Sequence, residues 1–349
     1  MKVIVQMPIE FIDESDLPPY WVTVIGVGGC GVHQVGTLQQ EYGESFKGLD
    51  IRYFAVDCDS APWLSRKTRK SSVPWVYWRW GSEPYHLCPQ SCHGDNAMAR
   101  GSDWNSVKPD VAKRFEFAAT NVLILIAGFG KRAGSGIAQA LAAQARIAGT
   151  TVFVLAALPF QSEKLCVNLA TEMNLLEDVC DGVLYFDQET HVESTFIPPK
   201  ASIGERMRIT NGRIEGCFHE LLKGMTCDPL TTSMYVPNVA NCFIKEGRIG
   251  HGVGIATCTS NTQEALARSL REAKQMAAIH SPRHGFLRVA HPPDVDRDTV
   301  WKEMRSALNA IPISQSMAFD KSVEADDSLV SEIVFSVFLA KGKSIPSDP

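Results

Sequence analysis

Two glycine-rich segments, far apart in the chain, have the composition that a backbone site for phosphate requires. Residues 26–31 have the sequence GVGGCG and residues 127–136 the sequence AGFGKRAGSG, and each follows an apolar run typical of a buried strand. A glycine-rich turn between a strand and a helix directs backbone N–H groups at one point, where the helix N-terminus adds partial positive charge. Two such turns on one chain can hold the phosphates of a nucleotide from both sides.

A second set of candidate ligands lies in an irregular, aromatic-rich stretch. His86, Cys88, Cys92 and His93 are residue types that bind zinc, and they fall within a compact window. Their spacing is only loosely that of a zinc site, and the adjacent Cys92 and His93 would be strained as a chelate. The alternative is a partly buried irregular loop. The sequence leaves both interpretations open, so no metal ligand is assigned.

The composition is that of a soluble globular protein of one large or two ordinary domains. The chain has 349 residues, of which 45% are hydrophobic and 21% charged, with a formal net charge of -5. This charge argues against nucleic-acid binding as the main function, and no apolar run is long enough to span a bilayer. The N-terminus lacks the features of a signal peptide. Ten cysteines without regular spacing indicate reduced thiols and a cytoplasmic protein.

The elements that must position the glycine turns alternate between strand and helix in the first half of the chain. The predicted strands are continuous apolar runs, which implies an α/β fold with a Rossmann-like parallel sheet covered on both faces. They cover residues 22–27, 51–56, 121–126, 151–157 and 182–186. Predicted helices lie at residues 32–41, 109–119, 135–148 and 164–179.

Pro198 and Pro199 mark a boundary, after which the pattern changes. A long helix is predicted at 203–223, followed by a smaller α+β unit with helices at 262–278 and 298–310 and strands at 285–290, 315–319 and 331–340. The predicted organisation is a nucleotide-binding domain, a central helix, a C-terminal α+β domain and a short tail, at residues 1–200, 201–225, 226–341 and 342–349.

The order of these pieces resembles the tubulin/FtsZ superfamily over almost the whole chain. The segment at 24–31 is similar to the family's first phosphate loop, and 127–136 to its signature loop, usually G-G-G-T-G-[ST]-G. Pro159, Phe160 and Glu163 match a P-F-x-x-E segment. Residues 249–254 resemble the family's glycine-rich strand, and 323–337 its closing strands. The resemblance implies GTP or GDP with Mg²⁺, and head-to-tail stacking of subunits into protofilaments.

The resemblance assigns site residues one by one. The phosphate-binding positions it implies are Gly28, Gly29, Cys30, Gly31, Gly128, Gly130, Lys131, Arg132, Gly134, Ser135 and Gly136. Lys131 and Arg132 replace glycines of the signature. They either contact the phosphates as cations, even in place of a metal, or point to solvent or to an adjacent subunit.

The remaining assignments concern the ribose, the base and the metal. Glu163 matches a ribose-binding carboxylate, although it is also placed as an ordinary acid at a helix N-terminus. Asn211 matches the helix asparagine that contacts guanine. Asp187 stands where the family has a second asparagine, and a carboxylate can accept from guanine N1–H and N2–H. Asp57 ends a strand near the expected Mg²⁺, either in a water-mediated contact or as a simple turn.

The loop that completes the hydrolytic site in the family is the clearest departure. An ungapped alignment from Asn211 places Met234 and Pro237 at the two acid positions. A shifted alignment places Asp228 at one acid position and Thr231 at the other. Because Asp228 precedes proline, it is typical of a turn, but it is the one catalytic candidate. Since positioned charges supply most of phosphoryl-transfer catalysis, their loss predicts weak or absent hydrolysis with binding retained.

The sequence therefore predicts a divergent, cytoplasmic FtsZ-like protein that binds guanine nucleotide and self-assembles head to tail. One alternative is an active cytomotive GTPase with unconventional residues, Asp228 with Lys131. Another is a nucleotide-free pseudo-GTPase, serving as a scaffold or as the partner of another tubulin-like subunit. A dinucleotide-dependent oxidoreductase would explain the first glycine turn but not the second. No nucleic-acid partner and no direct membrane insertion are expected.

Overall fold

The structure is a computed structural model of the chain. It describes residues 20–42, 46, 49–57, 75–77, 115–130, 133–163, 168–189, 198, 200–225, 243, 246–257, 261–278, 282, 284–311 and 318–340. The side chains at 75–77, 133, 318–320 and 322 fall outside this description.

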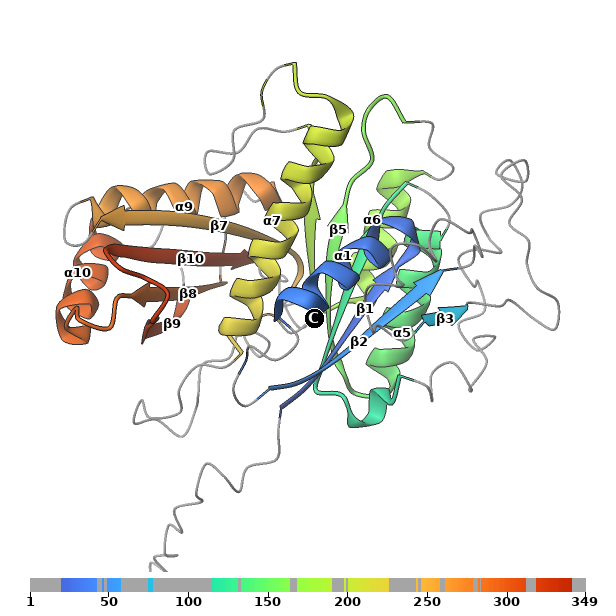
Figure 1. Ribbon diagram of the computed structural model, residues 1–349, viewed down its shortest axis with the longest axis horizontal. Helices are drawn as coiled ribbons and strands as arrows, with labels where there is room; N and C mark the ends of the chain where they lie inside the picture. Colours follow the sequence, from blue (N-terminus) through green and yellow to red (C-terminus); the bar gives the residue numbers. More distant parts are fainter. Residues whose placement is uncertain are drawn as a thin grey trace, which may run out of the picture.

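One mixed sheet runs through the molecule, with its strands in the order β3-β2-β1-β4-β5-β6-β7-β10-β8-β9 (Figure 1). Its first six strands are parallel. They are β3 (Trp75–Tyr77), β2 (Leu49–Asp57), β1 (Tyr20–Val27), β4 (Val122–Gly128), β5 (Thr151–Ala157) and β6 (Gly182–Phe186). The central strands β1, β4, β5 and β6 are apolar and buried along almost their whole length, as a sheet covered on both faces requires. The predicted α/β fold with a Rossmann-like parallel sheet is confirmed.

Helices cover both faces of this parallel part. On one face, α1 (Gly28–Tyr42) and α7 (Ile203–Lys223) pack on the sheet through side chains such as Val35, Ile214 and Phe218. On the other face lie α5 (Ala138–Ile147) and α6 (Leu169–Val179), packed through Leu141 and Leu176. A π-helical turn, η5 (Ala133–Ile137), leads into α5, and a short 3-10 turn, η4 (Phe117–Ala119), precedes β4.

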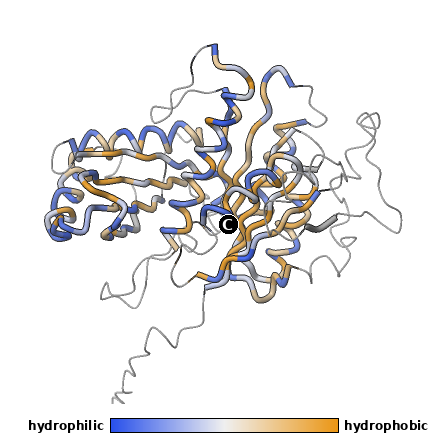
Figure 2. The backbone as a smooth tube through the Cα atoms, viewed as in Figure 1, coloured by the Kyte–Doolittle hydropathy of each residue, from blue (hydrophilic) through white to orange (hydrophobic). Residues whose placement is uncertain are grey.

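The C-terminal part continues the same sheet. β7 (Gly247–Thr257) pairs briefly with β6 and then runs antiparallel to β10 (Glu332–Ala340). β8 (His284–His291) lies between β10 and β9 (Ala318–Ala325). α9 (Thr262–Ala277) and α10 (Arg297–Ala310) pack on this part with side chains such as Leu266 and Met304. Figure 2 shows the strands as mainly hydrophobic and the outer sides of α9 and α10 as hydrophilic.

The glycine-rich sequence of β7 has a packing cause. A Cβ atom at Gly250 would lie 1.7 Å from the carbonyl oxygen of Ala273, and one at Gly254 would lie 1.9 Å from that of Ala265. Both carbonyls belong to α9. The alternate glycines therefore let the backbone of α9 lie directly on β7, which no larger residue would permit.

Ionic contacts join the C-terminal strands to the helices of the parallel part. Arg248 at the start of β7 donates to Glu177 Oε1 of α6, from Nε at 3.0 Å and from Nη2 at 2.7 Å. The fully buried Arg288 of β8 donates to Glu220 Oε2 of α7 at 2.7 Å and also pairs with Glu324 of β9. These contacts lie on α6 and on α7, which cover opposite faces of the sheet.

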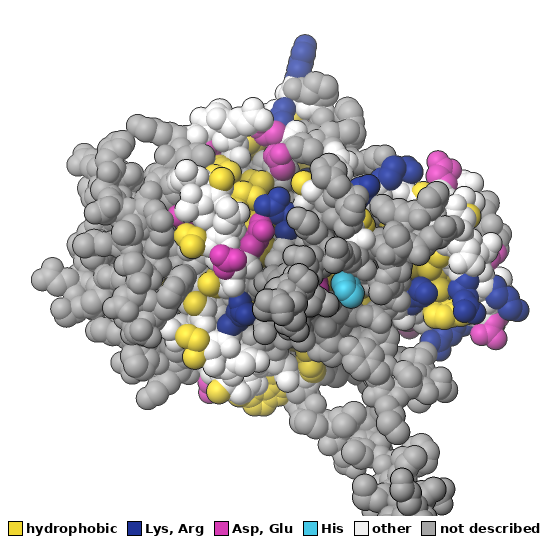
Figure 3. All heavy atoms as spheres, turned by 180° about the vertical axis from the view of Figure 1, so that it is seen from behind, with side chains coloured by type: hydrophobic (Ala, Val, Ile, Leu, Met, Phe, Trp, Pro, Cys, Tyr) yellow, Lys and Arg dark blue, Asp and Glu magenta, His cyan; other side chains and the backbone are white. Residues whose placement is uncertain are grey.

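Charged side chains of both signs lie interspersed on the described surface in Figure 3, which shows the molecule from behind. Among the described residues, no helix has the length and apolar character that crossing a membrane requires.

Several predicted boundaries need correction. The helix after the first glycine turn begins at Gly28, not at residue 32, so that the glycines form its first turn. α6 begins at Leu169 rather than 164, because the Asn168 side chain caps it by accepting from Thr171 N–H at 3.2 Å. The strand predicted at 315–319 is β9 at Ala318–Ala325. By contrast, the long helix predicted at 203–223 is confirmed as α7. The division into domains stays a prediction.

Candidate functional site

The first glycine turn passes from strand to helix without a loop. β1 ends at Val27 and α1 begins at Gly28, whose φ of 66° lies in the left-handed region that favours glycine. The first turn of α1 contains no acidic residue. Its leading N–H groups have no carbonyl partner within the helix, so this end of α1 carries partial positive charge with no carboxylate of its own to offset it.

The second glycine turn passes through a π-helical segment. β4 ends at Gly128, the left-handed Gly130 has a φ of 92°, and η5 covers Ala133–Ile137. The N–H of Phe129 donates to the Ala157 carbonyl at 2.8 Å, which ties the start of the turn to the end of β5. Short π-helical segments are frequent at functional sites because they displace the backbone from regular helical geometry.

The two turns lie side by side at one edge of the sheet. β1 and β4 are adjacent and parallel, with Val27 opposite Ala127, so Gly28 and Gly128 continue the same register. The N-terminal ends of α1 and η5 therefore open toward the same region. The carboxyl edge of a parallel sheet is where such folds bind ligands.

Direct backbone packing accounts for several of these glycines. A Cβ at Gly31 would lie 1.9 Å from the Ile126 carbonyl oxygen, and one at Gly134 would lie 1.9 Å from the Gly128 carbonyl oxygen. A Cβ at Gly128 would lie 2.8 Å from the Cβ of Cys30. These positions need glycine whether or not a ligand binds. The glycine pattern alone therefore identifies the fold of the turns rather than their ligand.

Buried polar groups near the turns provide evidence of a different kind. Ser135, in η5, is fully buried, and its Oγ has no hydrogen-bond partner among the described residues. Gln34 of α1 is also buried, and both polar atoms of its amide lack such partners. Leaving a buried polar atom unpaired costs about 1–3 kcal/mol. A phosphate oxygen at Ser135 would remove that cost, so this residue fits the ligand that the sequence predicts.

Two more predicted residues lie at or after the carboxyl ends of parallel strands. Asp57 is the last residue of β2 and is buried, one position past the pairing of Val27 with Val56. Glu163 follows β5, and its N–H donates to the Phe160 carbonyl at 2.9 Å. No group of three or more metal-ligating side chains occurs within the part of the chain that the structure describes.

Asp187, the predicted base contact, follows β6 and belongs to a small charged cluster. Its Oδ1 accepts the N–H of Glu189 at 2.8 Å, and its carbonyl accepts from Arg213 Nη1 at 3.1 Å. The Arg213 guanidinium also lies 5.8 Å from the centre of the Phe186 ring. Burial lowers the pKa of Arg213, while the carboxylates of Glu272 and Asp187 oppose that change.

Arg213 is a residue that the sequence did not single out. It lies on α7 close to Asn211, the other predicted base contact, which is half-buried. Between β6 and α7 it fixes the main chain of Asp187. The sequence places Arg213 two residues after Asn211, which could have pointed to it. A lone arginine on a long helix is, however, usually a solvent-exposed charge. The neighbouring Thr210 is buried with an unpartnered hydroxyl among the described residues.

Some predicted residues lie outside the described residues. They are Lys131, Arg132, Asp228, Met234, Pro237 and the group His86, Cys88, Cys92 and His93. The roles assigned to the basic pair, to the hydrolysis loop and to the zinc-type ligands therefore stay predictions.

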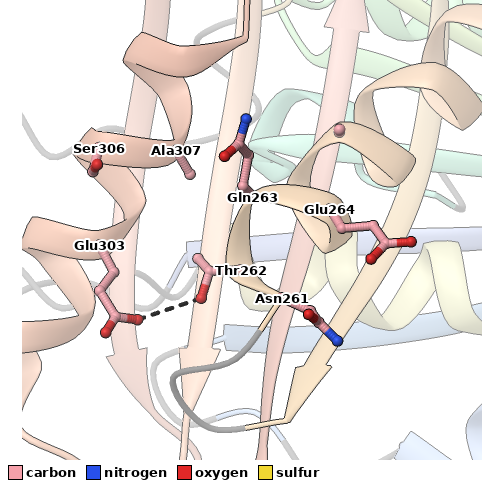
Figure 4. A pocket seen from close by; sticks show the side chains of 8 residues that line it. Asn261, Thr262, Gln263, Glu264, Glu303, Ser306 and Ala307 are labelled. Atoms are coloured by element: carbon pink, nitrogen blue, oxygen red, sulfur yellow. Dashed lines mark hydrogen bonds between the residues drawn. The ribbon is translucent and has the colours of Figure 1, made fainter.

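A separate hollow of about 610 Å³ lies in the C-terminal part (Figure 4). Residues at the start of α9 line it, together with Glu303, Ser306 and Ala307 of α10. Thr262 Oγ1 donates to Glu303 Oε2 at 3.3 Å. None of the predicted site residues lines this hollow, so it is distinct from the glycine turns.

Comparison with known proteins identifies the fold. No protein-family model matches the chain, and no curated protein matches it. A solved structure of a mutant FtsZ from M. jannaschii is 15% identical, with a TM-score of 0.71, over 92% of this chain and 91% of that one. A GTPγS-bound protofilament of CetZ2 from Haloferax volcanii is 20% identical, with a TM-score of 0.66, over 91% and 92%.

A GTPγS-form protofilament of TubZ from Bacillus thuringiensis serovar israelensis is 14% identical to this chain. Its TM-score is 0.60, over 93% of this chain and 86% of that one. With such low identities, the likeness concerns the fold alone, which this chain shares with these FtsZ, CetZ and TubZ structures. The resemblance that the sequence motifs indicate is thus matched by a shared fold over 91–93% of this chain.

Proposed function

We propose that this chain is a guanine-nucleotide-binding protein that assembles head to tail into filaments, with weak or absent hydrolysis. The observation that carries the proposal is the pairing of the two glycine turns at the ends of β1 and β4. It gains support from the shared fold, because the similar CetZ2 and TubZ structures are described as GTPγS protofilaments. Two helix N-termini opening toward one region form a site for a polyphosphate.

In this proposal the backbone does most of the phosphate binding. N–H groups at the start of α1, from Gly28 onward, contact one side, and those of η5 contact the other. The buried Ser135 hydroxyl donates to a phosphate oxygen. Lys131 and Arg132 supply positive charge to the same phosphates, each as a charge-assisted hydrogen bond.

The nucleoside lies toward α7. Glu163 accepts from the ribose hydroxyls, while Asp187 and Asn211 contact the base. The Asp187 carboxylate accepts from guanine N1–H and N2–H, which adenine does not offer in the same arrangement. Arg213 holds the main chain of Asp187 for this contact. Mg²⁺ adds charge neutralisation on the phosphates, and Asp57 contacts it through water.

Assembly follows from the organisation that we propose, with domains at 1–200 and 226–341 joined by a central helix. The segment after α7 contacts the nucleotide face of the next subunit, a second copy of this chain or another tubulin-like subunit. With Met234 and Pro237 in place of acids, this contact leaves the attacking water without a carboxylate. Filaments therefore persist, because no chemical step triggers disassembly. A cytoplasmic location is part of the same proposal.

A nucleotide-free scaffold is the second candidate, and one observation favours it. Backbone packing explains Gly31, Gly128 and Gly134 without any ligand. Under this alternative the chain keeps the fold and the subunit contacts but binds no GTP. The unpartnered Ser135 hydroxyl argues against it, because a scaffold gains nothing from an unpaired buried group.

Phosphate release and light scattering, followed on one sample of the full chain with GTP, test the proposal. Scattering that rises with GTP, without appreciable phosphate release, is the expected result. Concentration-dependent release at the rate of an active filament-forming GTPase would favour the cytomotive alternative. If neither signal appears, the result favours the nucleotide-free scaffold. Replacing Gly134 is a poor test of binding, because a side chain there meets the Gly128 carbonyl and disturbs the fold.

A further inference from the structure

Gln139 and Glu172 form a buried polar pair between α5 and α6, one helical turn after the second glycine turn. Gln139 of α5 is fully buried, and Glu172 in the first turn of α6 is almost so. Gln139 Nε2 lies 2.7 Å from Glu172 Oε2 and 3.3 Å from the Glu172 carbonyl oxygen. One amide group thus contacts both the side chain and the main chain of the same residue.

If this pair only filled space between the two helices, its burial would reduce the stability of the fold. Burying a carboxyl group and an amide between two helices requires desolvating both, and apolar side chains of similar size would fill the space without that cost. Buried polar pairs of this kind fix one arrangement of two elements against alternatives, because displacement leaves both groups unpaired.

The position of the pair indicates what it fixes. Gln139 lies one helical turn after Ser135, on the continuous segment formed by η5 and α5. The polar contact to α6 therefore lies one helical turn from Ser135 and holds this continuous segment against α6. On the other side of the pair, α6 begins shortly after Glu163, the proposed ribose contact.

We propose that Gln139 and Glu172 are positioning residues, which fix the phosphate turn, through η5 and the start of α5, against α6. This inference rests on the proposed function. Neither residue contacts the nucleotide. Their hydrogen bond holds η5 in the position in which its N–H groups and Ser135 meet the phosphates, so a small displacement of the turn weakens binding.

The chain offers a matched control at the other end of the same two helices. Arg146 Nη1, near the end of α5, donates to the Asp178 carbonyl of α6 at 2.7 Å. This contact also joins α5 to α6, but it lies on the surface at the helix end remote from the glycine turn. A purely structural role for Gln139 predicts that losing either contact has the same effect on binding.

The test measures GTP, GDP and GMP affinity in the full chain, with the melting temperature recorded without nucleotide. We expect Gln139→Leu to weaken GTP and GDP binding about tenfold or more, as losses of orienting groups do at metal sites. GMP, which has fewer phosphates at the turn, should weaken less. Glu172→Gln, whose amide oxygen still accepts from Gln139, should stay close to the parent, and Arg146→Leu should bind as the parent does.

The outcomes separate the inference from the proposed function. If the parent binds GTP and Gln139→Leu binds it equally well, the positioning role is wrong while the proposed function stands. If the parent binds no GTP, both are wrong. Should Gln139→Leu not fold, Gln139→Glu replaces it, because two adjacent carboxyl groups break the bond. Adding Glu172→Gln restores a donor and an acceptor, so affinity must recover in the double variant or the inference fails.

Discussion

The buried histidine of β7 makes a quantitative prediction about stability in acid. His251 Nε2 lies 3.0 Å from Ser336 Oγ of β10, and its ring stacks on Phe338 with 4.5 Å between ring centres. Burial lowers the pKa of His251 to about 4, opposed by the Glu220 carboxylate and reinforced by Arg213, both on α7. The folded protein therefore holds this histidine neutral under conditions in which the unfolded chain protonates it.

The size of the effect follows from the two pKa values. The ordinary pKa of histidine is 6.5, so stability falls as the pH drops from that value toward about 4. Between about pH 7.5 and pH 5 the His251 contribution to the loss is about 2 kcal/mol of unfolding free energy. The depressed pKa of Glu220 acts mainly below this window, because a carboxyl group in the unfolded chain titrates near 4.5.

Urea unfolding of the parent and of His251→Gln at the two pH values measures this contribution. Glutamine keeps a polar side chain beside Ser336 but does not titrate, so the variant should lose about 2 kcal/mol less on acidification. The control is His284→Gln, which removes an exposed histidine of β8 and leaves the contacts of His251 in place. Equal losses in the parent and in His251→Gln would refute the assignment of this pH dependence to His251.

Three further predictions concern the junctions of the fold. Arg288→Met should cost about 3–5 kcal/mol in urea unfolding, because it leaves the buried Glu220 and the half-buried Glu324 without the cation that they share. A loss below about 1 kcal/mol would contradict this role. Gly252→Ala should destabilise the protein, because the new Cβ would lie 2.1 Å from the Ser269 carbonyl oxygen of α9. An unchanged melting temperature would count against direct packing of α9 on β7. Gly216→Ala on α7 should instead stabilise by about 0.5–1 kcal/mol, because nothing lies within 4 Å of the new methyl group; destabilisation would show that this face of α7 is covered.

Sequence patterns predicted the parallel part of the fold well, because its strands are continuous apolar runs. The strands at Thr151–Ala157 and Gly182–Phe186 were predicted to the residue. Boundaries were wrong where polar capping decides them, as at Asn168, and where glycines form the first helical turn rather than a loop. A glycine run does not distinguish these two cases, because its backbone is permissive in both.

The candidate site was predicted in part. The two glycine turns were expected to meet, and their strands are indeed adjacent. Arg213 and the pair of Gln139 and Glu172 were missed, because each derives its role from a neighbour far away in the sequence. Such contacts leave no local pattern of spacing. The assignments to Lys131 and Asp228 stay predictions.

The central claim is that the two paired turns hold a guanine nucleotide, and calorimetric titration of the full chain tests it most directly. GTP is titrated into nucleotide-stripped protein with Mg²⁺, and ATP is titrated in parallel. We expect saturable binding of GTP, at about one nucleotide per chain, and much weaker binding of ATP, because Asp187 pairs with the donors of guanine. Absence of GTP binding by the folded protein, or equal affinity for ATP, would contradict it.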